Sequence, residues 1–369
     1  MTVVGVVGSG TMGAGIVQVA LEAGDDVVLF DIDPTSIGRA RDRVRDGLKR
    51  RAASIQIDDA AIDGWVDLHL DRLRSAVTLQ ALAGEAEIVI EAVLEDLGVK
   101  RATFRALDGA AQLTTILATN TSALSVGAIA SATAHPQRVV GLHFFNPVPL
   151  MALVEVVVTE SVARSCVERA EALARRWGRT TVRCADTPGF IVNRVNRPFT
   201  IQALRMLEDG EASVVAIDDA MRAGGFPMGP FALMDLVGID VNLAAATAIW
   251  EGLARPERLR PSPIQARLVA DARLGRKTGS GFYRYVDGVS VGVEADIAGP
   301  SVARLSPDLI RERIVRAIEE EARNLVHDGI ATAADIDLAL RLGAGHPRRT
   351  APGAGHVAGG ATSALRSMP

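Results

Sequence analysis

A glycine-rich turn near the amino terminus constrains the fold of this chain more than any other feature. The apolar, β-branched run 3–7 leads into Gly-Ser-Gly-Thr-Met-Gly at 8–13, and a helical pattern continues from Ala14 to Ala23. In a βαβ dinucleotide-binding unit, such glycines allow a tight turn, close approach of backbone amides to a pyrophosphate, and close packing of the helix, whose first N–H groups attract phosphate. A strand, turn and helix without any ligand is the alternative. The predicted dinucleotide contacts are Gly8, Gly10, Thr11, Met12 and Gly13.

Asp31 follows the second expected strand, 27–30, and lies about 20 residues beyond the glycine turn. A carboxylate at this position contacts the adenosine ribose and repels a 2′-phosphate, which favours NAD over NADP. Because Asp33 and Pro34 follow closely, a simple turn residue is the other interpretation of Asp31. We expect the ribose contact, with NAD as the cofactor.

The composition is that of an ordinary globular chain, long enough for two or more domains. Its 369 residues are 48% hydrophobic and 23% charged, with a formal net charge of −4. This charge gives no attraction to nucleic acid or an anionic membrane, and no apolar run approaches the roughly 20 residues of a membrane-spanning helix. Cys166 and Cys184 are too few for a disulfide framework or a zinc site. We therefore expect a cytoplasmic protein without a metal, a nucleic-acid partner or a membrane partner.

Strand and helix signals alternate as far as Asp186 and then give way to helices alone. This alternation predicts a mostly parallel sheet that helices cover on both faces. The stretch from 54 to about 79 is less regular than the segments around it. Beyond Asp31, the expected strands are 88–90, 115–118, 139–144, 153–158 and 181–183, and the expected helices are 35–53, 99–107, 126–132, 165–177, 189–209, 214–222 and 229–251.

A weak internal repeat lies in the helical part. Residues 203–224 resemble residues 322–343 without a gap, and both copies contain Asp-Gly and Ile-Asp at matching positions. A duplicated helical hairpin is the prediction, and chance similarity of two Ala/Leu/Arg-rich segments is the alternative. The expected fold is a Rossmann-type α/β domain followed by an all-helical domain with a partial second copy of its module. The expected ranges are 1–186 and 187–285 for these domains, 286–310 for a linker, 311–347 for the partial repeat and 348–369 for a disordered tail.

Among the six histidines, only His143 ends an apolar strand and enters a turn-rich loop. If the chain reverses at 147–149, His143 lies opposite Val154 or Glu155, and a carboxylate there would hold one imidazole nitrogen. Such a pair suits the dehydrogenation of an alcohol, because the imidazole takes the hydroxyl proton while a nicotinamide takes the hydride. A structural histidine and a solvated strand carboxylate are the alternative.

The run GLHFFNPVPLMALVEVV at 141–157 resembles the signature of the 3-hydroxyacyl-CoA dehydrogenase family, which includes bacterial 3-hydroxybutyryl-CoA dehydrogenases. The resemblance covers the chain from its start to about Tyr285, and residues 322–347 resemble a partial C-terminal module of longer members. Six further segments agree in order and spacing: GSGTMGAGI at 8–16, EAVLEDLGVK at 91–100, ATNTSAL at 118–124, DTPGFIVNR at 186–194, GGFPMGPFALMDLVGID at 224–240 and GRKTGSGFY at 275–283.

This resemblance implies roles for the matching residues. It places the catalytic acid–base pair at His143 and Glu155. Ser122 matches the serine that hydrogen-bonds the 3-oxygen of the substrate, and Asn193 matches the asparagine that helps to hold the substrate from the second domain. The remaining residues assigned to the cofactor are Glu95 and Lys100, at its nicotinamide end, and Asn120.

The resemblance also implies an activity, the reversible NAD-dependent oxidation of an (S)-3-hydroxyacyl-CoA thioester, with short chains such as 3-hydroxybutyryl-CoA favoured. A dehydrogenase of a free hydroxy acid and a non-catalytic NAD-binding protein are the alternatives. Relatives associate through their helical domains, so a homodimer is expected, with a pseudo-dimeric monomer as the alternative. The basic cluster 49–51 lies near the position where family members contact CoA phosphate, and a solvated helix face is its other interpretation.

Overall fold

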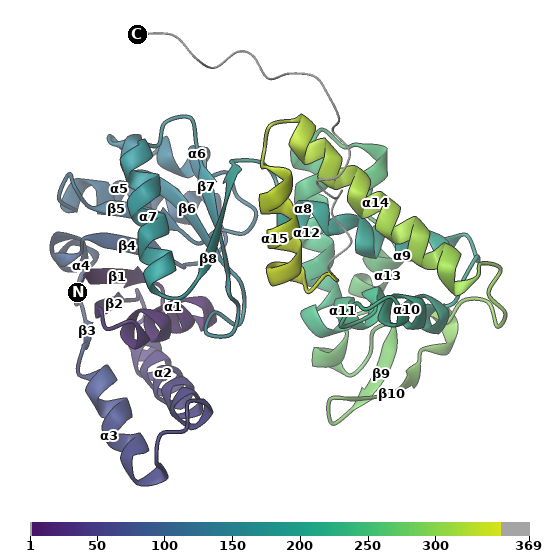
Figure 1. Cartoon of the computed structure of the whole chain (residues 1–369), viewed down its shortest axis with the longest axis horizontal. Helices are drawn as coiled ribbons and strands as arrows, with labels where there is room; N and C mark the ends of the chain where they lie inside the picture. The colour runs from purple at the N-terminus through teal and green to yellow at the C-terminus, as the bar shows by residue number, and fades with distance from the viewer. Residues whose placement is uncertain (1, 348–369) are drawn as a thin grey trace.

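The computed structural model describes residues 2–347 and divides them into a part built on a sheet and a helical part (Figure 1). The chain passes from the first part to the second after β8 (Thr180–Ala185). The tail at 348–369, predicted to be disordered, lies outside the described residues.

Eight strands form one sheet. They are β1 (Val3–Val7), β2 (Asp26–Phe30), β3 (Leu73–Ser75), β4 (Ile88–Glu91), β5 (Ile116–Thr119), β6 (Val139–Phe144), β7 (Leu153–Val158) and β8. Their order across the sheet is β3-β2-β1-β4-β5-β6-β7-β8. Every neighbouring pair is parallel except β6 and β7, which are antiparallel. The predicted mostly parallel, Rossmann-type sheet is therefore confirmed.

Helices pack on both faces of this sheet, as the alternation of signals predicts. One face carries α1 (Thr11–Glu22), α2 (Pro34–Ser54), α3 (Asp59–Leu70) and α7 (Arg164–Arg176), and the other carries α4 (Leu79–Glu85), α5 (Leu97–Ala110) and α6 (Val126–Ala130). Neighbouring strand residues point to opposite faces, so Val6 packs against the first set and Val7 against the second. The apolar core on the second face continues into the helical part and joins the two parts.

The second part is built from helices. They are α8 (Val192–Val195), α9 (Arg197–Glu208), α10 (Val214–Ala223), α11 (Pro230–Val237), α12 (Ile239–Gly252), α13 (Pro263–Ala270), α14 (Pro307–His327) and α15 (Ala333–Ala344). Two predicted helices are interrupted: that at 189–209 breaks at Asn196, and that at 229–251 bends by 102° at Gly238. Gly238 has a φ of +104°, which a helix interior does not adopt. Within residues 2–347, no single helix has the length and apolarity to cross a membrane, and one bent pair, α11 with α12, meets both criteria.

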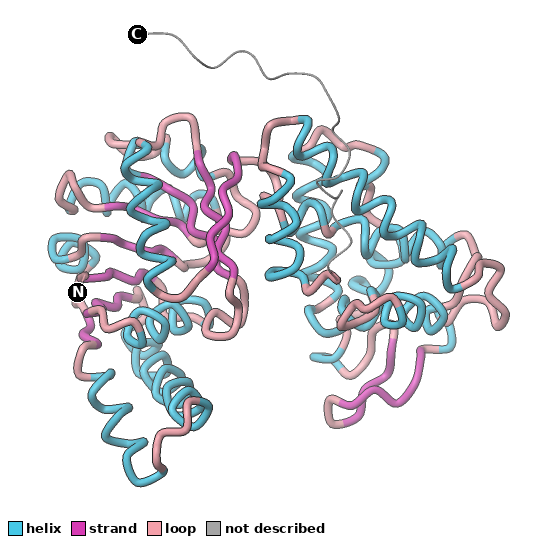
Figure 2. The backbone as a smooth tube through the Cα atoms, in the orientation of Figure 1, coloured by secondary structure: helices cyan, strands magenta, loops and turns pink. Residues whose placement is uncertain are grey.

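One strand pair lies beyond Asp186, where the sequence predicts none. Strands β9 (Tyr283–Val286) and β10 (Val289–Val293) form the antiparallel hairpin that Figure 2 draws in magenta within the helical part. Its two-residue turn consists of Asp287 and Gly288, whose φ angles are +49° and +74°. Hairpin turns of this length need positive φ, and Asp-Gly is one of the sequences that provide it. The prediction of an entirely helical second part is wrong at this hairpin.

The predicted duplication is present, because α9–α10 and α14–α15 are equivalent helical hairpins. The glycines that follow the first helix of each, Gly210 and Gly329, have φ angles of +62° and +68°. Ser213 and Thr332 cap the second helix of each by accepting a backbone N–H three residues ahead. Helix α14 packs against α9 and α10, so the partial copy covers the first module.

A buried carboxylate holds the helical part together. Asp218 of α10 accepts hydrogen bonds from the backbone N–H groups of Phe231 (2.9 Å) and Ala232 (3.0 Å), and from the Tyr283 hydroxyl (2.8 Å). It thus caps α11, whose N-cap residue is Gly229 because a Cβ there would lie 2.3 Å from the Asp218 carboxyl carbon. Burial raises the pKa of Asp218 from 3.8 to about 6, although these hydrogen bonds oppose the rise.

This shift predicts a pH-dependent stability. Between about pH 4 and 6 the folded protein keeps a proton on Asp218 that the unfolded chain has released, so the stability that this residue contributes is largest below pH 4 and falls as the pH rises to 6. Relative to Asp218→Asn, the free energy of unfolding of the wild type should decrease by about 2 kcal/mol between pH 4 and 7. Urea unfolding across this range measures it. A difference that does not change with pH would contradict the prediction.

Candidate active site

The glycine turn closes tightly before α1 and leaves the N-terminus of this helix without a side-chain cap. Gly8 has a φ of +101°, and a Cβ there would lie 2.5 Å from the Ala92 carbonyl oxygen. A Cβ on Gly13 would lie 1.9 Å from the Gly8 carbonyl oxygen, so α1 can approach the turn only through a glycine. At Gly10, the N-cap of α1, a Cβ would meet nothing within 4 Å, and no side chain caps the helix. This open, uncapped helix N-terminus fits a pyrophosphate.

Asp31 is fixed beside this turn. Its Oδ2 accepts hydrogen bonds from the backbone N–H (2.7 Å) and the hydroxyl (2.6 Å) of Ser9, and its Oδ1 accepts the N–H of Asp33 (2.9 Å). Burial alone would raise the pKa of Asp31, but these hydrogen bonds outweigh it and lower the pKa. The carboxylate is therefore ionised at neutral pH and positioned next to the phosphate-binding turn. The bond from Asp33 shows that Asp31 is a turn residue as well.

A cavity of about 780 Å³ lies where the sheet meets the helical part, and it collects most of the predicted site. Glu155 contacts His143 but does not itself line the cavity. Gly8, Gly10, Thr11, Gly13 and Asp31 are not among its lining residues within 2–347. The predicted residues that line it are Met12, Glu95, Lys100, Asn120, Ser122, His143 and Asn193.

His143 and Glu155 form a buried pair. The antiparallel register of β6 and β7 places them opposite one another, and the His143 Nδ1 lies 2.6 Å from the Glu155 Oε2. The second oxygen of Glu155 accepts the backbone N–H groups of Ile191 (3.0 Å) and Val192 (2.8 Å) at the start of α8. Because Glu155 engages Nδ1, the nitrogen of His143 that remains for a ligand is Nε2. This carboxylate therefore orients the imidazole and links the sheet to the helical part.

Ser122 and Asn193 meet across the boundary between the two parts. The Asn193 side-chain amide donates to the Ser122 carbonyl oxygen at 3.4 Å. The Asn120 side-chain oxygen accepts the backbone N–H of Phe144 at 2.8 Å, which ties the loop after β5 to the residue following His143. The three polar residues and the imidazole thus line one region of the cavity.

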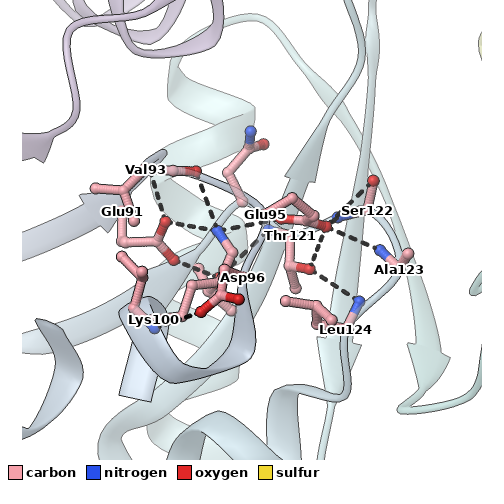
Figure 3. A network of polar contacts seen from close by, with 12 residues as sticks. Glu91, Val93, Glu95, Asp96, Lys100, Thr121, Ser122, Ala123 and Leu124 are labelled. Atoms are coloured by element: carbon pink, nitrogen blue, oxygen red, sulfur yellow. Dashed lines mark hydrogen bonds and ion pairs between the residues drawn. The ribbon is translucent and has the colours of Figure 1, made fainter. Parts of the chain in front are cut away.

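A polar network holds the loop after β4, where Glu95 lies (Figure 3). The Lys100 ammonium, which is 1% exposed, lies 2.6 Å from the Glu91 Oε1 and 3.2 Å from the Glu95 Oε2. Glu95 Oε1 accepts the Thr121 hydroxyl (2.7 Å) and the Ser122 N–H (2.8 Å). Burial would raise the pKa of Glu95, but Lys100 and these bonds lower it. The network fixes Ser122 relative to Glu95.

Sequence reasoning missed Glu91 and Arg197. Glu91 is an acid that ends the apolar strand β4 and is fully buried, and a carboxylate next to the run 88–90 is the signal that could have found it. Arg197 also lines the cavity, at the start of α9. The signal that could have found Arg197 is the lack of an acidic residue three or four positions away, where an arginine on a helix usually finds an ion-pair partner.

The basic cluster 49–51 forms ion pairs at the surface. Lys49 lies 2.8 Å from Asp63 of α3, and Arg51 lies 3.7 Å from Glu22 of α1. Both interpretations of this cluster therefore stay open. Within residues 2–347, no three His, Cys, Asp or Glu side chains are grouped so that they could hold a metal ion.

A phosphate-binding turn at the edge of a Rossmann-type sheet defines a dinucleotide-binding protein. Comparisons with known proteins specify the family. Residues 3–187 match the profile described as "3-hydroxyacyl-CoA dehydrogenase, NAD binding domain", and residues 189–285 and 310–354 match "3-hydroxyacyl-CoA dehydrogenase, C-terminal domain". The chain belongs to the 3-hydroxyacyl-CoA dehydrogenase family, as its sequence motifs indicate, and the match to an NAD-binding domain confirms the predicted cofactor.

Three known proteins show the extent of the likeness. The 3-hydroxyadipyl-CoA dehydrogenase of Escherichia coli K12 is 44% identical over 281 residues, which are 76% of this chain and 58% of that protein. The mitochondrial hydroxyacyl-coenzyme A dehydrogenase of Sus scrofa is 40% identical over 282 residues, 76% of this chain and 90% of that protein. The crystal structure of 3-hydroxybutyryl-CoA dehydrogenase from Escherichia coli K12 has a TM-score of 0.82 at 34% identity and covers 93% of this chain and 89% of that one.

Proposed function

We propose that this protein oxidises (S)-3-hydroxyacyl-CoA thioesters to 3-oxoacyl-CoA with NAD, and catalyses the reverse reaction with NADH. The observation that carries this proposal is the 2.6 Å contact between His143 and the buried Glu155, beside a cavity that Ser122 and Asn193 also line. The names of the relatives, 3-hydroxybutyryl-CoA and 3-hydroxyadipyl-CoA dehydrogenase, support a thioester substrate.

The residues of the site supply the proton chemistry. NAD, held by the glycine turn and Asp31, would supply the acceptor for the hydride of C3. The His143 Nε2 accepts the proton of the 3-hydroxyl group as the C3–O bond becomes a carbonyl, and returns it in the reverse direction. The Glu155 carboxylate, which accepts from Nδ1, fixes the tautomer and stabilises the imidazolium that forms. Ser122 and Asn193 orient the 3-oxygen towards the imidazole, a contribution of positioning.

The glycine turn and Asp31 would hold the adenosine half of NAD, with the pyrophosphate at the N-terminus of α1. Met12, Glu95, Lys100 and Asn120, at the cavity, would surround the nicotinamide half. With this arrangement the nicotinamide would lie on the side of the cavity that His143 lines, so that the hydride and the proton would leave the same carbinol group.

The test is an NADH oxidation assay at 340 nm with acetoacetyl-CoA, longer 3-oxoacyl-CoA thioesters and free acetoacetate. We expect turnover of the thioesters and at most weak turnover of acetoacetate. Turnover of acetoacetate alone would identify a dehydrogenase of free hydroxy acids. If NADH binds and no substrate reacts, the protein is a non-catalytic homologue and the proposal is wrong.

Cofactor choice gives a separate prediction. The Asp31 carboxylate is ionised and fixed by Ser9. It would accept a hydrogen bond from the 2′-hydroxyl group of the NADH ribose, whereas it would repel the 2′-phosphate of NADPH. We expect kcat/KM to be about 10-fold or more higher with NADH than with NADPH. Asp31→Ala should reduce this preference, and equal efficiency of both cofactors with the wild type would contradict the ribose contact.

The expected homodimer stays a proposal, as does the cytoplasmic location. The partial second module packs on α9 and α10 of the first, and buried Glu321 of α14 binds Arg194 (2.8 Å) and Arg258 (2.7 Å). This packing favours the alternative of a pseudo-dimeric monomer, in which one chain supplies both modules. The molar mass in solution, measured by light scattering, distinguishes the two states.

A further inference from the structure

Arg197 is a buried cation that has no charged partner among the residues that the structure describes. Its side chain, at the first position of α9, is 7% exposed and lines the cavity. The Nε has no hydrogen-bond partner, and the guanidinium forms no ion pair with any side chain in residues 2–347. Burial lowers the pKa of Arg197 to about 10, so the group remains charged at neutral pH.

The other buried cations of the described chain are all neutralised. Lys100 binds Glu91 at 2.6 Å, and Arg138 binds Asp108 at 2.7 Å. Arg194, which precedes Arg197 by one helical turn, binds Glu321 at 2.8 Å and Asp328 at 3.1 Å. An uncompensated buried charge destabilises a folded protein, because its lost hydration is not replaced. The unpaired Arg197 guanidinium therefore indicates that an anion from outside the chain binds it.

The position of Arg197 says which part of a ligand could carry that anion. Asn193, four residues earlier, meets Ser122, so the end of the cavity that receives the 3-oxygen lies about one helical turn, roughly 6 Å, away. The acid that lines the cavity, Glu95, is already paired with Lys100. The phosphates of CoA are strongly hydrated and suit the surface, whereas Arg197 is buried. A carboxylate on the acyl chain, beyond C3, would reach it.

We infer that Arg197 binds a carboxylate at the far end of the acyl chain, so that the substrates are 3-hydroxyacyl-CoA thioesters of dicarboxylic acids. This inference rests on the proposed function and specifies its substrate class. The guanidinium and a carboxylate can form two parallel hydrogen bonds, which replace the missing hydration of both groups. An acyl chain that ends in a methyl group would leave Arg197 buried and unpaired.

The test compares two thioesters of six-carbon acyl chains that differ only at the terminal group, (S)-3-hydroxyadipyl-CoA and (S)-3-hydroxyhexanoyl-CoA. We expect the wild type to prefer the carboxylate by about 10–100-fold in kcat/KM, the value of a hydrogen bond to a charged group. Arg197→Met should abolish this preference. Arg205→Met is the matched control, because Arg205 lies on α9 outside the cavity and donates to the Glu257 carbonyl, and it should retain the preference.

Binding separates this inference from the proposed activity. Adipyl-CoA and hexanoyl-CoA lack the 3-hydroxyl group and cannot react, so their dissociation constants report on Arg197 even if the protein has no dehydrogenase activity. We expect adipyl-CoA to bind more tightly to the wild type, and both to bind equally to Arg197→Met. An equal loss of affinity for both ligands in Arg197→Met would show that the arginine binds CoA or only maintains the fold, and would overturn the inference.

Stability supplies a further readout. If Arg197 is kept for a ligand, Arg197→Met removes a buried, unpaired charge and should raise the melting temperature of the ligand-free protein by about 2–4 °C. A purely structural arginine would give a decrease. A lower melting temperature together with no preference of the wild type for adipyl-CoA would refute the assignment.

Discussion

Replacing His143 by alanine should lower kcat by about 10²–10⁴-fold, the usual contribution of a general acid or base. The imidazole lines the cavity and is oriented by a buried carboxylate, through the 2.6 Å contact with Glu155. Without it, the hydroxyl proton has no acceptor when the hydride leaves. The affinity for NADH should be retained, because the glycine turn and Asp31 are unchanged. Initial rates at saturating substrate and a fluorescence titration of NADH measure the two quantities.

His135 offers a matched control. It also pairs with a carboxylate, since its Nδ1 lies 3.2 Å from Asp108, but it does not line the cavity. His135→Ala should keep kcat within about twofold, apart from any change in stability. If both variants lose turnover equally, or if His143→Ala retains it, the proton transfer does not run through His143.

The pairing of His143 with Glu155 shows how far sequence reasoning reaches into the site. Two apolar strands around a short proline-containing loop predict an antiparallel pair, and counting outward from the turn gives Val154 or Glu155 as the partner. The pattern could not decide between them, because a change of one residue in the register moves every side chain to the other face. The structure selects Glu155, where the alternation in β7 points a carboxylate and His143 to the same face.

The elements that the sequence did not predict are short or exposed. Strand β3 has three residues, and only Leu73 among them is buried, so it carries almost no alternating pattern. The break at Gly238 requires a positive φ, and glycine also occurs inside helices, so the residue type alone does not show a bend. The hairpin at 283–293 had a usable signal, the Asp-Gly turn between a tyrosine-rich and a valine-rich segment.

Interactions between distant segments explain why sequence reasoning missed Glu91 and Arg197. Glu91 and Lys100 are both charged, and neither pattern nor propensity shows that they are buried together. For Arg197 the informative property is the lack of a charged partner within residues 2–347, which becomes visible only when the folded chain surrounds the side chain. Motif resemblance assigned Glu95 and Lys100 to the nicotinamide end of the cofactor. It gave no role to Glu91, the first residue of the same matched segment, which neutralises Lys100.

A substitution of Lys100 tests whether its ion pair with Glu91 stabilises the site. The ammonium lies 2.6 Å from Glu91, which is fully buried, and Thr119 donates its hydroxyl to the other oxygen of Glu91 at 2.7 Å. Lys100→Met leaves the Glu91 charge buried without its counter-ion. We therefore expect the free energy of unfolding to fall by about 3–5 kcal/mol, and the melting temperature to fall by roughly 10 °C, as calorimetry and urea unfolding would measure.

A second substitution shows whether the loss comes from the stranded charge or from missing packing. Glu91→Gln combined with Lys100→Met removes both charges, and the amide oxygen can still accept the N–H of Val93, so more than half of the stability should return. Lys49→Met is the surface control, because the exposed pair with Asp63 should contribute less than about 1 kcal/mol. If the double variant is as unstable as Lys100→Met, the lysine stabilises the loop through its aliphatic chain, and the ion pair is not what fixes Glu95 and Ser122 beside the cavity.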